Sequence, residues 1–139
     1  MLKLKKYVII ILMASLITIF NDHFMEFIDD IQSIFPYNTD ILTAKNSFIA
    51  IKKMNPAIII KIWLKYIASI YKDQIDNDDI SFFVSKDYAA DLVNSTNSDK
   101  IMESINRLRD PVSKMNSDEQ SKTMKYIKNL TRISLMYKA

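Results

Sequence analysis

The chain has 139 residues, room for one domain, and 49% of them are hydrophobic, which is enough for a core and argues against wholesale disorder. It contains no Gly and only 3 Pro. Hairpin turns and phosphate-binding loops rely on the positive φ angles that glycine adopts freely, so this composition argues against β-sandwiches, doubly wound α/β folds and glycine-dependent nucleotide motifs. We predict an all-α protein, with an N-terminal hydrophobic anchor helix followed by a small bundle of about four or five helices.

Two further counts narrow the classes of function. The chain has no Cys, which removes disulfides, thiolate metal sites and cysteine nucleophiles together. The net charge is +3, and part of it lies in the N-terminal lysines Lys3, Lys5 and Lys6. So small and local an excess gives no reason to expect a nucleic-acid partner.

The N-terminal segment places these lysines before an uninterrupted apolar run at positions 7–20. That order is typical of a signal peptide, a signal anchor or a short transmembrane helix. No small-residue cleavage pattern follows, because positions 16–20 are mostly bulky. We favour an uncleaved membrane anchor and keep a cleaved signal peptide and a buried core helix as alternatives. The residues expected to enter the membrane are Tyr7, Val8, Ile9, Ile10, Ile11, Leu12, Leu16, Ile17, Ile19 and Phe20.

The flanking charges predict an orientation for such an anchor. Lysines precede the apolar run, and acidic residues, beginning with Asp22 and Glu26, follow it. By the positive-inside rule the N-terminus lies on the cytoplasmic side. The rest of the chain would then face a lumen, the exterior or the interior of a virus particle.

Apolar residues continue at helical spacing from Phe24 to Ile34, and Pro36 disfavours a helical residue before it. We therefore divide the chain into residues 1–35, a membrane-anchor helix with an amphipathic extension, and residues 36–139, a helical bundle domain. The second helix is expected to begin with Thr39 or Asp40 as N-cap and to end near Met54.

The third predicted helix, Pro56–Tyr71, is apolar except for one lysine-rich stripe, which places it at the centre of the bundle. The acidic stretch Asp73–Asp79 follows. A calcium-binding loop starting at Asp76 would place Ile80 at a ligand position and lacks the required Gly, so we favour a solvated connection. The segment Ile80–Val84 is compatible with a helical turn or an extended link.

Short helical patterns complete the chain. Residues 85–92 resemble a short helix, and a fifth helix is predicted from Ser98 to Arg109, with Pro111 ending or kinking it. Ser117 and Gln120 form a capping-box pattern that predicts the start of a last helix, which continues to about Tyr137.

Catalysis finds little support in the sequence. The only His is His23, next to the anchor, and no particular pair of carboxylates stands out. We therefore predict a protein that is not an enzyme, with no catalytic residues, no metal, no cofactor and no small-molecule substrate.

Aromatic residues cluster in the middle of the chain, where they form either a docking patch for a partner or the core of a small bundle, and we favour the core. Two arginines beside Pro111 either bind an acidic partner or are simply solvated. The candidate partner-binding residues are Trp63, Tyr66, Phe82, Phe83, Tyr88, Arg107 and Arg109.

From Asp40 to the end, the chain resembles a family of small uncharacterised helical proteins of nucleocytoplasmic large DNA viruses, the giant viruses. The order and spacing of several pieces carry this resemblance: Asn55-Pro56 with Trp63, residues 79–83, residues 86–88, residues 105–111, and residues 126–131 with Tyr137.

The resemblance implies a virus-encoded structural protein, plausibly a minor capsid component between the outer shell and an internal membrane. Its partners would be other virion or capsid proteins, and its location the virion, at or near an internal membrane, with a host membrane during assembly. A domain that faces the capsid conflicts with the orientation that the charges predict, unless the anchor is interfacial or the domain faces the virion interior. The alternative function is a secreted or host-directed helical binding protein with a cleaved signal peptide.

Overall fold

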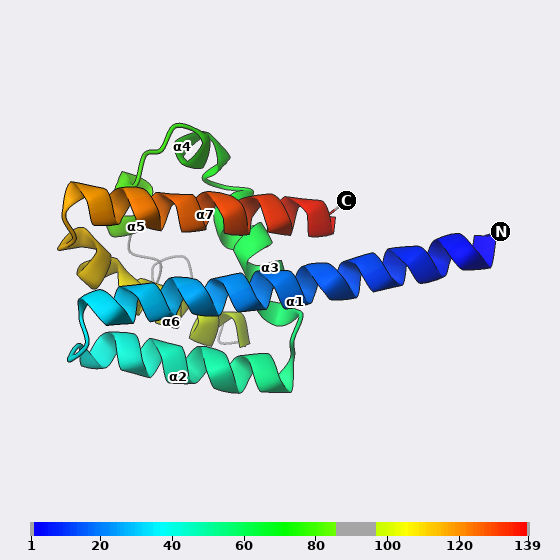
Figure 1. Cartoon of the computed structure of the whole chain (residues 1–139), viewed down its shortest axis with the longest axis horizontal. Coiled ribbons are helices and arrows are strands. Elements are labelled where there is room, and N and C mark those ends of the chain that lie inside the picture. Colours follow the sequence, from blue (N-terminus) through cyan, green and yellow to red (C-terminus); the bar gives the residue numbers. More distant parts are fainter. Residues whose placement is uncertain (1, 86–96, 139) are drawn as a thin grey trace.

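A computed structural model describes residues 2–85 and 97–138, and within these ranges every regular element is a helix, which confirms the all-α prediction. A long apolar N-terminal helix leads into a helical bundle and projects from one end of it (Figure 1). The elements are α1 (Leu2–Ile34), α2 (Thr39–Met54), α3 (Ile58–Trp63), the π-helical turn η1 (Leu64–Ala68), α4 (Lys72–Asp76), α5 (Ser81–Ser85), α6 (Asn97–Ser113) and α7 (Ser117–Lys138).

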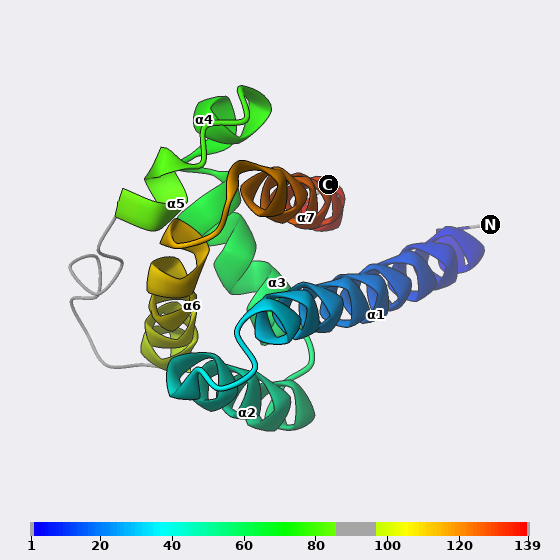
Figure 2. The same ribbon diagram turned by 60° about the vertical axis from the view of Figure 1, so that its left-hand side comes forward.

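The bundle is arranged around α3. Helix α1 packs beside α7, α2 packs beside α6, and α3 contacts all four of these helices (Figures 1 and 2). The side chains of Ile59, Ile60 and Trp63 are buried, whereas Lys61 is exposed. The predicted central helix with one lysine-lined edge is therefore present.

Aromatic rings from three helices form the middle of the core. Phe24 of α1 lies with its ring centroid 4.6 Å from that of Phe48 of α2 and 6.0 Å from that of Trp63 of α3, both in edge-on geometry. The indole N–H of Trp63 donates a hydrogen bond of 3.1 Å to the hydroxyl of Thr131 on α7. This bond satisfies the one polar atom of a side chain that is only 1% exposed.

Helix starts are capped one residue earlier than the sequence predicted. Asn38, and not Thr39 or Asp40, caps α2, because its side-chain oxygen accepts hydrogen bonds from two backbone N–H groups of the first turn. The predicted capping box at Ser117 is likewise wrong by one residue. Asn116 accepts from the N–H of Glu119 at 2.8 Å, and the Glu119 carboxylate accepts from the N–H of Asn116 at 3.0 Å.

Two predicted helices have different ends in the structure. The α-helical part of the third helix stops at Trp63 and passes into η1, in which the N–H of Ser69 bonds to the carbonyl of Leu64 five residues earlier. Helix α6 continues through Pro111 to Ser113, because a proline so near the end costs few helical hydrogen bonds. Residues 81–85 are helical, which settles the open choice for that segment, and the predicted helix at 85–92 lies mostly outside the described residues.

Only part of the long helix α1 packs within the bundle. Helix α1 ends at Ile34, close to the boundary at residue 35, and it is unbroken from Leu2. Its second half belongs to the core, because Phe20, Phe24, Phe27 and Ile28 are all buried. The exposed part of α1 and the bundle therefore meet at Phe20.

Candidate membrane anchor and surface sites

The first half of α1 stands away from the bundle, and its apolar side chains are exposed (Figures 1 and 2). Ile10 is 61% exposed and Ile11 is 63% exposed, whereas Phe20 is fully buried. Of the ten predicted membrane residues, Leu16 and Ile17 are half-buried and Phe20 is in the core. The other seven are exposed: Tyr7, Val8, Ile9, Ile10, Ile11, Leu12 and Ile19.

The exposed apolar surface runs around the whole circumference of the helix. Residues 7–12 are consecutive and all exposed. Each residue of an α-helix is rotated by about 100° from the one before it, so six consecutive side chains point in every direction around the axis. A helix that lies flat in a membrane interface has one apolar and one charged face, whereas a helix that is apolar on all sides suits a bilayer or a protein interior. The all-round pattern favours a spanning segment over an interfacial one.

The length and composition of α1 agree with this interpretation. Residues Lys3–Ile34 form a helix long and apolar enough to cross a membrane, and the most apolar 18 residues of it have a mean hydropathy of 1.9. Only 17% of these residues are buried, whereas the core helix of a soluble protein would be mostly buried. From Leu2 to Ile19 the helix is about 27 Å long, but this length includes Lys3, Lys5 and Lys6; the uncharged residues 7–19 span about 20 Å, less than the roughly 30 Å of a bilayer's hydrocarbon layer.

The change from exposed to buried surface coincides with a polar contact. Asn21 is buried, and its side-chain N–H₂ donates a hydrogen bond of 2.8 Å to the backbone carbonyl of Pro56. Pro56 lies in the connection between α2 and α3. The bond therefore fixes that connection beside the point where α1 leaves the bundle.

His23 takes part in a packing contact between α1 and α7. Its ring lies 4.9 Å from that of Tyr126, and its Nδ1 is 3.5 Å from the Glu26 carboxylate. The Tyr126 hydroxyl donates a hydrogen bond to Asp30. Burial, reinforced by this bond to a carboxylate, raises the pKa of Tyr126 to about 12, so its phenol stays protonated and holds α7 against α1.

Most of the candidate aromatic residues are part of the core. Trp63, Phe82 and Phe83 are buried, so a partner cannot reach them in this fold and the docking-patch interpretation does not hold for them. Tyr66 is half-buried, and the ammonium of Lys65 lies 5.2 Å from the centre of its ring. Tyr88 lies outside the described residues.

The two candidate arginines are engaged within the fold. Arg107 lies 2.8 Å from the Asp40 carboxylate and 3.7 Å from that of Glu103, which ties α6 to the first turn of α2. Arg109 is half-buried and also interacts within the protein. Binding an acidic partner through these side chains would require such contacts to be exchanged.

The acidic stretch forms local pairs. Asp76 bonds Lys72 and Asp78 bonds Lys128, each at 2.7 Å. Asp79 accepts hydrogen bonds from the hydroxyl and the backbone N–H of Ser81, which lower its pKa. In the described ranges no group of three or more His, Cys, Asp or Glu side chains is arranged to hold a metal ion.

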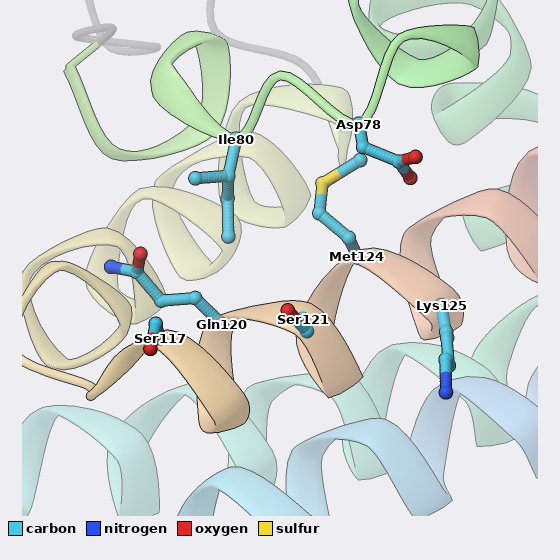
Figure 3. Close-up of a pocket in the computed structure, with 7 residues that line it drawn as sticks. All are labelled: Asp78, Ile80, Ser117, Gln120, Ser121, Met124 and Lys125. Carbon is cyan, nitrogen blue, oxygen red and sulfur yellow. The ribbon is translucent and has the colours of Figure 1, made fainter.

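A pocket of about 470 Å³ lies between the connection from α4 to α5 and the first turns of α7 (Figure 3). Its lining residues include one carboxylate, Asp78, which is paired with Lys128, and no histidine. Ser117 and Ser121 therefore have no histidine among the lining residues, and the carboxylate there is engaged by Lys128. The full lining is Asp78, Ile80, Ser117, Gln120, Ser121, Met124 and Lys125.

Comparison of the chain with protein-family models, with curated proteins and with solved structures finds no match.

Proposed function

We propose that this chain is a membrane-anchored structural protein in which the first half of α1 crosses a bilayer and the bundle binds other proteins beside it. The observation that carries the proposal is the first half of α1, which is apolar on all sides, exposed, and continuous with a helix of the core. Exposed apolar surface on this scale is costly in water and calls for a lipid or protein environment.

A role without catalysis is supported by the character of the surface sites. The pocket beside α7 in Figure 3 has its one lining carboxylate in an ion pair, and His23, which lines a second pocket with Asp22 and Glu26, packs against Tyr126. The bundle therefore offers shape and charge to a partner, and we propose no substrate, cofactor or nucleic acid.

The setting that we propose is a virus particle, with other virion or capsid proteins as partners and an internal membrane as the site of the anchor. This part rests on the resemblance to small helical proteins of giant viruses. Its test is purification of particles: the protein should remain with them through density centrifugation. Its absence from purified particles would remove the viral role and leave the membrane anchor in place.

The experiment for the anchor itself is extraction of membranes with alkaline carbonate. The chain is expressed with an epitope tag at each end, and membranes are washed at high pH and probed for both tags. We expect the full-length chain to stay in the pellet, as an integral protein does. Full-length chain in the supernatant would contradict a spanning anchor.

The second candidate is a secreted binding protein whose exposed segment is a signal peptide. The observation that favours it is the coincidence of the exposed part of α1 with the predicted apolar run, which ends where the core begins. Cleavage after Phe20 would still remove one core ring, which stacks 5.9 Å from Phe24. Mass spectrometry of the mature N-terminus separates the candidates: a chain that begins near Asn21 supports secretion, and an intact start supports the anchor.

A further inference from the structure

We propose that the end of the bundle from which α1 emerges is itself a membrane-binding surface, which contacts the anionic phospholipid headgroups around the protein's own anchor. We call it the basal face and define it by Lys52, Lys53 and Met54 at the end of α2 and by Arg132 and Met136 on α7. The inference rests on the proposed function, because it takes the first half of α1 to be in a bilayer.

The fold brings these side chains to one end of the molecule. Helices α2 and α7 both run back along the second half of α1, and their C-terminal ends lie where α1 leaves the bundle (Figures 1 and 2). The bond from Asn21 to Pro56 fixes the end of α2 at that level. On the other side of α1, Arg132 lines a cleft together with Ile19 and the carboxylates Asp22 and Glu26.

No spacer separates the basal face from the apolar run. Helix α1 is continuous through Phe20, so the bundle cannot swing away from the membrane without breaking a helix. Ile17, within the run, and Tyr137, in the last turn of α7, both pack against the core. Figure 1 shows the end of α7 near the point at which α1 leaves the bundle, so the last turn of α7 would lie close to the membrane interface, where tyrosine side chains are commonly found.

The length of the anchor increases this contact. The uncharged residues 7–19 span about 20 Å, less than the roughly 30 Å of a hydrocarbon layer, and the helix reaches about 27 Å only when Lys3, Lys5 and Lys6 are included. A short spanning helix is accommodated by thinning of the bilayer and by polar flanking residues that reach into it. Both responses draw the basal face toward the headgroups.

The chemistry of the basal face suits anionic lipid. Met54 is 81% exposed and Met136 is 61% exposed, so two flexible apolar side chains extend from it. Lys52 and Lys53 lie directly beside Met54, and no Asp or Glu occurs in the sequence between residues 41 and 72. Exposed apolar side chains beside lysines are the combination that binds anionic membrane surfaces. Because anionic lipid is enriched on the cytoplasmic side, this proposal places the bundle there, opposite to the orientation that Lys3, Lys5 and Lys6 predict.

The lysines at the end of α2 are available for such contacts. Among the ion pairs within residues 2–85 and 97–138, Lys45 and Lys72 bond carboxylates, and none involves Lys52 or Lys53. Asp22 and Glu26 of α1 line the same cleft as Arg132 and oppose part of the charge on that side of the face. A cavity of about 190 Å³ beside Met54, lined also by Lys100, gives further apolar surface next to a cation.

The test uses the absence of cysteine from the chain. Two variants of the full-length protein are made, Met54→Cys and, as a matched control, Tyr37→Cys. In each, one polarity-sensitive fluorophore is attached to the introduced cysteine. Tyr37 is 96% exposed and precedes the other end of α2. The proteins are reconstituted in vesicles of phosphatidylcholine, with or without phosphatidylglycerol, and nitroxide-labelled lipid serves as the quencher.

We expect the fluorophore at residue 54 to shift to the blue and to be quenched by the labelled lipid, more strongly in the vesicles with phosphatidylglycerol. The fluorophore at residue 37 should behave as in water. Equal, water-like emission at both positions would overturn the proposal. Equal quenching at residue 54 in the two kinds of vesicle would overturn the assignment to anionic headgroups.

Charge reversal tests the role of the lysines. In the protein labelled at residue 54, Lys52→Glu with Lys53→Glu should remove the extra quenching in anionic vesicles, whereas Lys114→Glu with Lys122→Glu, distant from the basal face, should not. Unchanged quenching in the first variant would contradict the proposal. Carbonate extraction of the same vesicles separates the two proposals. Release of the chain from the vesicles would overturn the proposal of a spanning anchor. Retention of the chain with residue 54 in water would overturn only the proposal that the basal face binds lipid.

Discussion

The two halves of α1 are both rich in large apolar residues, yet the structure gives them opposite environments. From Phe20 onward the apolar side chains are buried against α2, α3 and α7, and before Phe20 most are exposed. The difference lies in the polar residues. Acidic side chains occupy one side of the second half, at Asp22, Glu26 and Asp29, whereas residues 7–12 include no charged residue.

The comparison shows that total hydrophobicity does not decide where a helix lies. A helix with one apolar face can pair with a bundle and present its other face to water. A helix that is apolar on every side gains from a medium that surrounds it completely. Four substitutions test this contrast, and they follow in order of expected effect.

Removal of a core ring from the second half should have the largest effect. Phe24→Ala deletes a fully buried side chain whose ring contacts those of Phe20, Phe27, Phe48 and Trp63. We expect the free energy of unfolding to fall by about 3–5 kcal/mol, as is usual for such cavities. Urea unfolding in detergent, followed by the fluorescence of the single Trp, measures the loss. Ile10→Ala is the control and should leave the midpoint unchanged; an equal loss in both variants would remove the contrast.

A charge in the first half should act on membrane insertion. Ile10→Lys places a cation on a segment that we propose to lie in hydrocarbon, at a cost of about 2.5–3.5 kcal/mol at the centre of a bilayer. A larger fraction of the chain should then be released by carbonate. Ser33→Lys, on the exposed side of the second half, should be retained like the natural chain. Equal retention of both variants would show that the first half is not immersed.

The junction between the halves should depend on Asn21. Asn21→Ala removes a part-buried hydrogen bond to the carbonyl of Pro56, an exposed residue. The expected loss of stability is about 0.5–1.5 kcal/mol, the usual net contribution of one hydrogen bond. Differential scanning calorimetry in detergent detects it, and Thr18→Ala, which loses a bond at an exposed site of the same helix, is the matched control. A larger loss from the control would show that the junction does not depend on this bond.

The smallest effect concerns pH. The pKa of Tyr126 is raised to about 12, from an ordinary value near 10, so the folded state holds the phenol proton more tightly than the unfolded chain does. The resulting stabilisation is complete below pH 10 and is lost as the pH rises toward 12. Tyr126→Phe should therefore show a shallower fall of stability between these values than the natural chain. Parallel curves for the two proteins would contradict the role of the bond to Asp30.

Local patterns in the sequence were sufficient to predict much of this fold. The absence of glycine indicated an all-helical fold, because it is a property of the composition. The lysine stripe identified the central helix α3, because it depends only on residues close together in the sequence. The caps at Asn38 and Asn116 were predicted one residue late, since several adjacent residues can accept the same bonds. Pro111 was expected to break its helix, but a proline in the last turn interferes with few bonds.

The candidate sites depended more on contacts between distant residues. The apolar run at 7–20 was visible in the sequence, but the burial of Phe20 became apparent only when α2 and α3 were in place. The arginine at 107 could not be paired in advance, because its partner Asp40 lies on another helix, 67 residues earlier. The basal face is of the same kind, since it joins the ends of two helices that are far apart in the chain.

The π-helical turn η1 accommodates an extra residue in the wall of the core. In it the N–H of Ser69 bonds to the carbonyl of Leu64, five residues earlier, whereas an α-helix bonds four residues earlier. Ile62 and Ile67 are five residues apart, as are Trp63 and Ala68, and all four side chains are buried. In a regular α-helix such pairs would point about 140° apart. The wider turn therefore keeps Ile67 and Ala68 on the buried side of the helix, and deletion of one residue within it should restore α-helical spacing without exposing them.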